Sequence, residues 1–293
     1  MSEVPRMLRE PRLPWPKHVE QPSVRPPALD GVAASVTFIG HSTFLIQTAA
    51  GNILTDPMNS GRAGPLNRIG PRRVRQPAVR FDDLPAISTV LLSHNHYDHC
   101  DLATLRRLAR RFNPLVVTPL ENGRLVRSAG LRRVEECDWW QQAQSPTLPI
   151  TLTPARHFSA RTPFDRNRAL WSGFVLAVRN VRIFFAGDTA YAPFFTDIRE
   201  RLGPIDLALL PIGAYEPRWF MQDQHMNPDE AVRAHLDLQA RVSIATHFGC
   251  FQLTDEGIDD PLRELEAARL RHGVAAEQFR ALEVGATLSL PVA

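Results

Sequence analysis

The sequence predicts an α+β protein in which two β-sheets pack together and helices cover their outer faces. Short runs of β-branched and aromatic residues come in groups early in the chain and alternate with helical segments later, which is typical of packed sheets with flanking helices. Of the 293 residues, 44% are hydrophobic and 22% charged, enough for a sizeable core. Residues 32–291 contain neither a repeat nor a linker. We therefore expect one domain over residues 32–293.

Residues 1–31 are proline-rich, and we expect them to form an extended arm. Seven of the first 27 residues are proline, which disfavours a helix. The arm lacks the apolar centre of a signal peptide, and no run in the chain approaches the ~18 apolar residues of a spanning helix. Three scattered cysteines, Cys100, Cys137 and Cys250, favour a reducing compartment. These features predict a cytoplasmic protein whose only membrane contact would be peripheral.

Residue patterns predict the individual elements. SVTFIG, TFLIQT and NILTDP predict three consecutive strands, with AAG as the turn between the last two. ISTVLLS predicts a buried strand, and DLATLRRLARRF predicts an amphipathic helix after it. Further strands are predicted at PLVVT, ITLTPAR, WSGFVLAVR, VRIFFAG, DLALLPIG and RVSIATH, and helices near residues 193–202, 228–239 and 260–272.

A long basic loop, residues 59–80, separates the third strand from ISTVLLS. It carries six arginines, all within residues 62–80, and no acidic residue. Loops of this length in compact domains are usually functional or disordered. A solvated surface loop is the default interpretation, and contact with anionic lipid headgroups is the next. Contact with nucleic-acid phosphates is the third, and we do not expect it.

A dense cluster of metal-ligand types follows ISTVLLS, in the stretch LLSHNHYDHCD. It contains His94, His96, Asp98 and His99 within six positions. As mere structure such a cluster would be costly, so a metal site is the favoured interpretation. Three more candidates also follow predicted strands, and strand ends can converge on one edge of a sandwich: His157, Asp188 and His247.

Seven ligands are too many for one zinc ion, which usually takes four, and suit two ions that share a carboxylate. Our allocation gives His94, His96 and His157 to the first ion. Asp98, His99 and His247 go to the second ion. Asp188 bridges the two, because a carboxylate offers two oxygens. Imidazole and carboxylate without thiolate fit two Zn²⁺, and iron or manganese fit the same donors.

The motif HNHYDH after an apolar strand resembles the hallmark of the metallo-β-lactamase superfamily, whose fold is an αβ/βα sandwich of two mixed β-sheets flanked by helices. Further segments resemble the family of N-acyl-phosphatidylethanolamine-hydrolysing phospholipases D: FIGHSTFLIQ, ILTDP, TPARHFSART, FFAGDTAY, GPIDLALLPIGAYEPRWFM, HMNPDEAVRAH and ATHFG. The resemblance covers residues 36–252, and PIGAYEPRWFM is its most specific segment for this branch.

This resemblance implies the same seven ligands and a dinuclear zinc phosphodiesterase of phospholipase D type. The implied substrate is an N-acyl-phosphatidylethanolamine-like glycerophospholipid, and the products are N-acylethanolamine and phosphatidic acid. The resemblance also implies a homodimer. His99 favours two filled sites over a single-zinc arrangement.

Three further polar residues are candidates for supporting roles. His225, in the loop MQDQHMNP, is the candidate proton donor to the leaving alcohol, or a supporting group that orients a water; a solvated loop histidine is the alternative. Asp56 and His41 follow strands and are candidates to hold metal-bound histidines, although both are also typical turn residues. His18, His235 and His272 lie outside every motif, and we expect them to be solvated.

Aromatic residues suggest where a lipid substrate would bind. Trp219, Phe220 and Met221, with Phe194 and Phe195, would admit acyl chains if they border the cavity, although such residues are more often core. Trp139 and Trp140 are expected in the core. The fold alone leaves other substrates open: a lactone, a cyclic phosphodiester or a sugar phosphate. A metal-binding scaffold without turnover is a further alternative, which the complete ligand set argues against.

Overall fold

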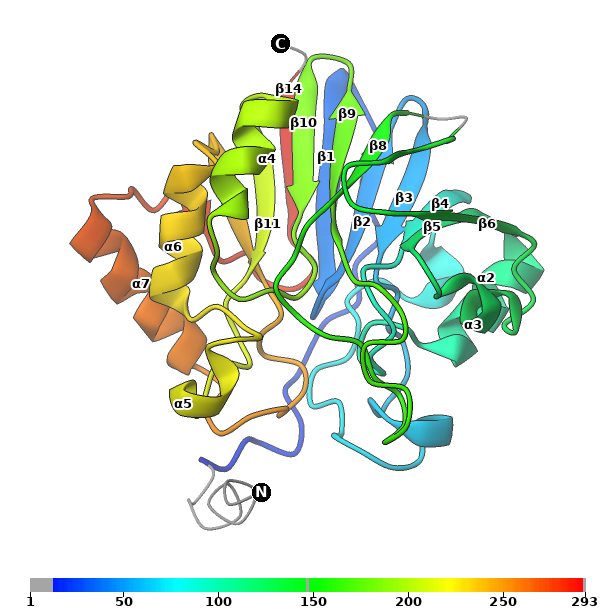
Figure 1. The fold of residues 1–293 in the computed structure, drawn as a ribbon, viewed down its shortest axis with the longest axis horizontal. Coiled ribbons are helices and arrows are strands. Elements are labelled where there is room, and N and C mark those ends of the chain that lie inside the picture. Colours follow the sequence, from blue (N-terminus) through cyan, green and yellow to red (C-terminus); the bar gives the residue numbers. More distant parts are fainter. Residues whose placement is uncertain (1–12, 146–147, 292–293) are drawn as a thin grey trace.

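The computed structural model describes residues 13–145 and 148–291. Two seven-stranded mixed sheets face each other (Figure 1), in the orders β14-β1-β2-β3-β4-β5-β6 and β13-β12-β11-β10-β9-β8-β7. The first sheet consists of β1 (Val32–Gly40), β2 (Thr43–Thr48), β3 (Gly51–Thr55), β4 (Ile87–Leu91), β5 (Leu115–Pro119), β6 (Arg133–Cys137) and β14 (Thr287–Pro291). The second consists of β7 (Gln142–Ala143), β8 (Ile150–Thr153), β9 (Gly173–Val178), β10 (Val181–Phe185), β11 (Leu207–Pro211), β12 (Val242–Thr246) and β13 (Phe279–Arg280).

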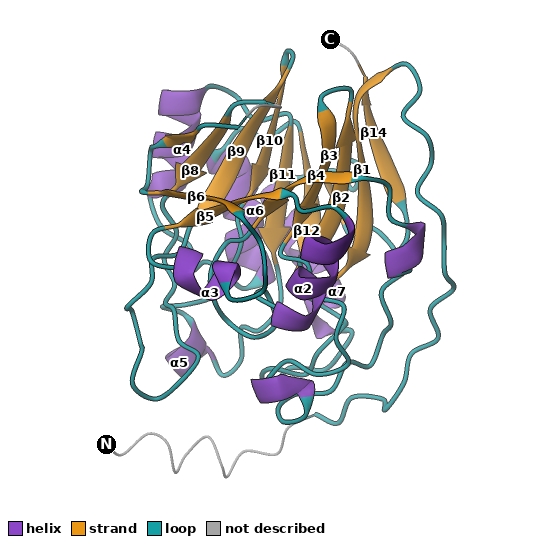
Figure 2. Cartoon of the chain, turned by 90° about the vertical axis from the view of Figure 1, so that its right-hand side faces the viewer, coloured by secondary structure: helices purple, strands orange, loops and turns teal. Residues whose placement is uncertain are grey.

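Helices cover both outer faces, as the sequence predicts. α2 (Leu102–Arg111) and α3 (Gly123–Arg127) lie against the first sheet (Figure 2). α4 (Phe194–Leu202), α6 (Pro228–Asp237) and α7 (Asp260–His272) lie against the second sheet. α5 (Arg218–Met221) is a single turn at the lower end in Figure 1. The described helices include none with the length and apolar character needed to cross a membrane.

Local sequence explains where the two best-defined helices begin. The Asp101 side chain accepts a hydrogen bond from the Ala103 N–H at the start of α2. At the start of α6, Asn227 and Glu230 form a reciprocal capping box, and Pro228 occupies the first helical turn.

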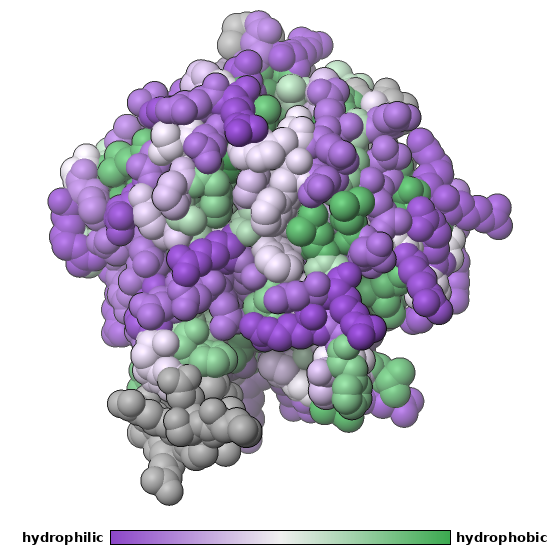
Figure 3. Space-filling view, in the orientation of Figure 1, coloured by the Kyte–Doolittle hydropathy of each residue, from purple (hydrophilic) through white to green (hydrophobic). Residues whose placement is uncertain are grey.

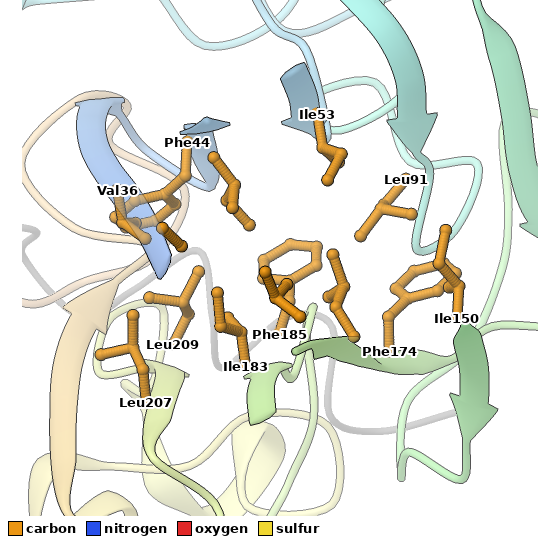
Figure 4. Packing of buried hydrophobic residues seen from close by; sticks show 14 of the residues in the cluster. Val36, Phe44, Ile53, Leu91, Ile150, Phe174, Ile183, Phe185, Leu207 and Leu209 are labelled. Atoms are coloured by element: carbon orange, nitrogen blue, oxygen red, sulfur yellow. The ribbon is translucent and has the colours of Figure 1, made fainter. Parts of the chain in front are cut away.

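Apolar side chains from the two sheets interdigitate to form the central core (Figure 4). Phe44 and Leu91 of the first sheet face Phe174, Ile183 and Phe185 of the second, all fully buried. The two-sheet sandwich expected from the sequence is therefore confirmed.

Several elements escaped the sequence patterns. β6 reads RVEEC and is half-exposed at the edge of its sheet, so it has no continuous apolar run. β7 and β13 have two residues each, too short for any period to show. The expectation that Trp139 and Trp140 are core was wrong in part. Both are only partly buried, and the Arg201 guanidinium lies 4.4 Å above the Trp140 ring.

The described part of the arm, residues 13–31, is extended and contains no helix. It runs along the basic loop, where Val19 N–H donates to Val74 O and Val24 N–H to Ala78 O, both at 2.8 Å. Gln21 Nε2 donates to Val284 O at 2.9 Å. The arm therefore ties the basic loop to the C-terminal strand region. Residues 1–12 lie outside the described residues.

Truncating Phe174 to Ala should lower the free energy of unfolding by about 3–5 kcal/mol, because it opens a cavity between the sheets. Phe164→Ala is the matched control, since Phe164 is 85% exposed and its truncation should change stability by no more than about 0.5 kcal/mol. Urea unfolding of both variants in one metal-containing buffer measures the difference. Equal losses would contradict the assigned core.

Candidate metal centre

Strand direction brings the predicted ligands to one end of the sandwich. β8 and β10 are both antiparallel to β9, and β11 and β12 run parallel to β10, so β8, β10 and β12 point the same way. His157, Asp188 and His247 follow the carboxyl ends of these three strands. The stretch from His94 to His99 follows β4, in the facing sheet.

Sharp backbone turns at the strand ends direct side chains inward. His41, Asp56 and His247 directly follow β1, β3 and β12, with φ values of 58°, 32° and 62°. Such angles are uncommon outside glycine and typically mark functional sites. Before Asp188, Gly187 has φ 61°, and a Cβ there would lie 2.7 Å from Ser93 Cβ. Glycine is therefore required at that turn.

The first ligand set gathers His94, His96 and His157. His94 Nε2 and His157 Nε2 lie 2.9 and 3.2 Å from His96 Nδ1. His157 Nδ1 donates its proton to the Gln224 carbonyl at 2.9 Å, which leaves Nε2 as a lone-pair donor. Burial lowers the pKa of His96 to about 3 and that of His157 to about 4. Neutral imidazoles with inward lone pairs are the form that binds metal.

The second set gathers Asp98, His99 and His247. Nε2 of His99 and Nε2 of His247 each lie 3.4 Å from Asp98 Oδ2. His41 Nε2 lies 3.0 Å from the same oxygen. Burial lowers the pKa of His41 to about 3, so the neutral ring donates this proton to Asp98 and orients the carboxylate.

Asp188 lies between the two sets. Its Oδ2 is 3.0 Å from His99 Nε2 and 3.1 Å from His247 Nε2. The same oxygen is 3.8 Å from His94 Nε2 and 3.9 Å from His157 Nε2. Burial alone would raise the pKa of Asp188, but the two closest histidines hold it well below its usual range. A carboxylate within reach of both sets suits the bridging role allocated to it.

Asp56 links the two ligand sets through the Nδ1 atoms of their histidines, on the side of each ring opposite Nε2. Its Oδ2 accepts from His99 Nδ1–H at 2.7 Å and from the Ser93 hydroxyl at 2.5 Å. Because the Ser93 proton is committed to Asp56, the Ser93 oxygen accepts from His94 Nδ1 at 2.8 Å. Asp56 Oδ1 accepts the Ser93 N–H at 2.7 Å. One buried carboxylate thus fixes a histidine of each set with Nε2 directed inward.

The donor set fits divalent cations. Burial alone would lower the pKa of His99 and His247, but nearby aspartates hold that of His99 well above normal and raise that of His247 to about 9. The buried carboxylates therefore stabilise positive charge beside them, and bound metal ions would supply that charge. Among the described residues, His99 Nε2, both His247 ring nitrogens and Asp188 Oδ1 are buried without a hydrogen-bond partner. Burial raises the pKa of the Cys100 thiol to about 12, so it is no thiolate ligand.

His225 lies at the edge of the same cluster. It is buried, its Nε2 is 3.9 Å from Asp188 Oδ2, and its ring centre is 4.9 Å from that of His157. Arg218, at the start of α5, donates to the His225 carbonyl at 2.9 Å and forms an ion pair with Glu230. The solvated-loop alternative for His225 was therefore wrong.

Of the other side chains considered, only some lie where the sequence predicts. His235 was expected in solvent but is buried on the inner face of α6, with Nδ1 2.8 Å from Ser243 Oγ of β12. His18 is exposed, and His272 is partly exposed beside Asp229. Phe195 is fully buried and its ring lies tilted against that of Phe194, and both pack in the helix-covered core.

Arg161 is a supporting residue that the sequence patterns did not identify. Its guanidinium donates to the Asn95 and Cys100 carbonyls at 2.7 and 3.0 Å, and it lies 3.9 Å above the Tyr97 ring. It thus holds the loop that carries His96 and Asp98. Its place in TPARHFSART, four residues after His157, was the only available signal.

Comparisons with known proteins agree with the fold. Residues 51–248 match the family model described as the beta-lactamase superfamily domain. An uncharacterized protein of Mycobacterium tuberculosis is 41% identical over 244 residues, which is 82% of this chain and 65% of that protein. The Caenorhabditis elegans protein N-acyl-phosphatidylethanolamine-hydrolyzing phospholipase D 1 is 37% identical over 248 residues, which is 80% of this chain and 70% of the relative. The chain thus spans about two thirds of the length of these relatives.

Among solved structures, an isothiocyanate hydrolase from Delia radicum gut bacteria superimposes with a TM-score of 0.70. The match covers 88% of this chain and 100% of that chain at 22% identity. At this identity the likeness shows the fold alone.

Replacing Asp56 with Asn should weaken metal binding by about 10–100-fold, because the amide cannot accept from His99 and Ser93 as the carboxylate does. Elemental analysis after dialysis against graded chelator measures the effect. Asp82→Asn is the matched control, since the Asp82 side chain is 89% exposed. Identical metal retention by the two variants would disprove the role of Asp56.

Proposed function

The chain belongs to the beta-lactamase superfamily, and from that premise we propose that it is a dinuclear zinc phosphodiesterase. Its proposed substrates are N-acyl-phosphatidylethanolamine-like glycerophospholipids. Water adds to phosphorus, the bond from phosphorus to the ethanolamine oxygen breaks, and N-acylethanolamine and phosphatidic acid are released.

The observation that supports the hydrolase part of this proposal is the position of Asp188 within reach of two groups of buried donor side chains. His94, His96 and His157 would hold one ion. Asp98, His99 and His247 would hold the other, and Asp188 would bridge. Two divalent cations supply an activated water and neutralise charge on the phosphoryl oxygens.

The surrounding residues would keep those donors in place. Asp56 fixes the orientation of His94 and His99, and His41 orients Asp98, so these three side chains are held in place before a substrate arrives. Arg161 fixes the loop between them. Such preorganisation spares the site from rearranging during the reaction.

The substrate part of the proposal rests on similarity to the Caenorhabditis elegans phospholipase D. The single turn α5 supports this part of the proposal. Its Phe220 is 39% exposed, and the Trp219 ring packs against the Phe220 ring. The neighbouring Arg218 donates to the His225 carbonyl. These aromatic side chains are suited to contact an acyl chain. Burial lowers the pKa of His225 well below its usual value, so its neutral ring would orient a water that gives a proton to the leaving alkoxide, or would pass that proton on.

Metal removal should abolish turnover. We expect chelator-treated protein to lose hydrolysis of bis-p-nitrophenyl phosphate and to regain it on addition of Zn²⁺.

Asp188→Asn should lower kcat/KM by more than about 100-fold, since it weakens the donor shared by both sets. Asp82→Asn is the control for the charge change, and activity that survives chelation or Asp188→Asn at full rate would refute the two-metal mechanism.

A substrate panel tests the substrate class. We expect N-acyl-phosphatidylethanolamine to yield N-acylethanolamine, detected by mass spectrometry. Preferred turnover of a lactone, a cyclic phosphodiester or a sugar phosphate would support the proposed hydrolase activity but contradict the proposed lipid substrate. No turnover of any substrate by metal-loaded protein would favour a scaffold.

His225→Ala should separate two kinds of leaving group. An alkoxide needs a proton as it leaves, whereas p-nitrophenolate does not. The variant should therefore lose about 10²–10⁴-fold on the lipid and far less on the p-nitrophenyl ester, with metal content unchanged. His18→Ala, an exposed histidine, is the matched control. Equal losses on both substrates would remove His225 from proton transfer.

A further inference from the structure

Three large apolar side chains stand in solvent on two loops. Leu66 and Ile69, in the basic loop, are 87% and 68% exposed, and Phe164, in the loop of residues 158–168, is 85% exposed. Single exposed apolar residues are common, but side chains this large and this free contribute nothing to the core. Leu66 also has a left-handed backbone, with φ 54°, which is unfavourable for leucine.

Both loops are anchored to the segment that carries the metal ligands. The N–H groups of Asn59 and Ser60 donate to Asp101 Oδ2 at 3.3 and 3.0 Å. Buried Arg73 donates to the carbonyls of Ser60 and Met58, which fixes the base of the same loop. The exposed tip is therefore carried on a rigid base.

The second loop is fixed in the same way. Tyr97 donates to the Arg161 carbonyl at 2.9 Å, and Arg161 binds the Asn95 and Cys100 carbonyls. Both loops project from the end of the molecule where the strand ends meet (Figures 1 and 2), and apolar atoms appear there in the space-filling view (Figure 3). The two loops thus lie at the same end of the molecule as the candidate metal centre.

Arginines flank these apolar tips. The first loop adds Arg62, Arg68 and Arg72, and residues 59–80 contain no acid. The second loop adds Arg166 and Arg168, both exposed. Its acidic residue, Asp165, accepts the N–H groups of Arg161 and Thr162 at 2.9 and 2.8 Å, so its charge is largely satisfied locally.

We propose that these apolar tips and flanking arginines form a rim surface that docks on an anionic phospholipid membrane: Leu66, Ile69, Phe164, Arg62, Arg68, Arg72, Arg166 and Arg168. Apolar tips enter the boundary between headgroups and acyl chains, and guanidinium groups bind lipid phosphates. This combination suits a bilayer better than a nucleic acid, which would use the arginines but leave Leu66 and Ile69 in water.

This inference deepens the proposed function by naming the source of the lipid substrate. The biological role of docking rests on the proposed function. Docking itself does not, because it is measured on vesicles that contain no N-acylated lipid. The metal centre would then face the membrane that supplies the substrate.

The experiment is co-sedimentation with vesicles of phosphatidylcholine alone or with added phosphatidylglycerol. We expect binding to the anionic vesicles, weakened by salt. Leu66→Ser/Ile69→Ser/Phe164→Ser should lower vesicle affinity at least about tenfold, and Arg68→Gln/Arg72→Gln should reduce the preference for anionic lipid. Leu270→Ser is the matched control, since Leu270 is 78% exposed on α7, away from both loops.

All variants should keep their metal content and their turnover of soluble bis-p-nitrophenyl phosphate, which separates docking from folding and from catalysis. Vesicle binding equal to wild type in the triple variant would overturn the proposal, as would wild-type protein that binds single-stranded RNA but no vesicles. Vesicle binding without any turnover would leave docking in place and count against the proposed function alone.

Discussion

The structure around the candidate metal centre is governed by one constraint, the burial of three carboxylates close together. Asp56, Asp98 and Asp188 are each at least 90% buried, and an unpaired charge in such a place is strongly unfavourable. Every one of them is met by imidazole or hydroxyl groups. The histidines next to Asp98 and Asp188 hold the pKa of both carboxylates well below normal despite burial. The site is therefore built for positive charge.

The sandwich architecture is what allows so many polar groups to meet. The carboxyl ends of strands β8, β10 and β12 lie at the same end of the second sheet, and β3 and β4 run parallel to each other in the first sheet. The apolar core lies between the sheets, so the polar residues begin only where the strands stop. Left-handed turns at His41, Asp56 and His247 then point the side chains inward, and the packed core holds these unfavourable angles in place.

Arginine serves opposite purposes within one loop. Arg73 is buried and binds three backbone carbonyls, those of Met58, Ser60 and Arg75, so it acts as a structural brace. Arg68 and Arg72 are exposed near the apolar tips of the rim surface. A rigid base and an exposed tip are both needed if the loop is to present apolar groups to a membrane without collapsing onto the protein.

The sequence by itself determined the type of fold and the candidate ligands. Apolar runs of strand length, separated by polar turns, predicted most of the two sheets, and donor residues at the ends of those runs predicted where a metal site would form. These features are local, because a strand and the residue after it are neighbours along the chain. Short or half-exposed strands such as β7 and β6 carry no such pattern and were missed.

Only the tertiary structure decided how the candidates act on one another. The contact of Asp56 with His99 and the relay through Ser93 to His94 join segments 37 or more residues apart. The burial of His235 and Arg73, and the exposure of Leu66, also depend on which element packs over each residue. A residue's type does not state its neighbours, and it is the neighbours that set charge, protonation and exposure.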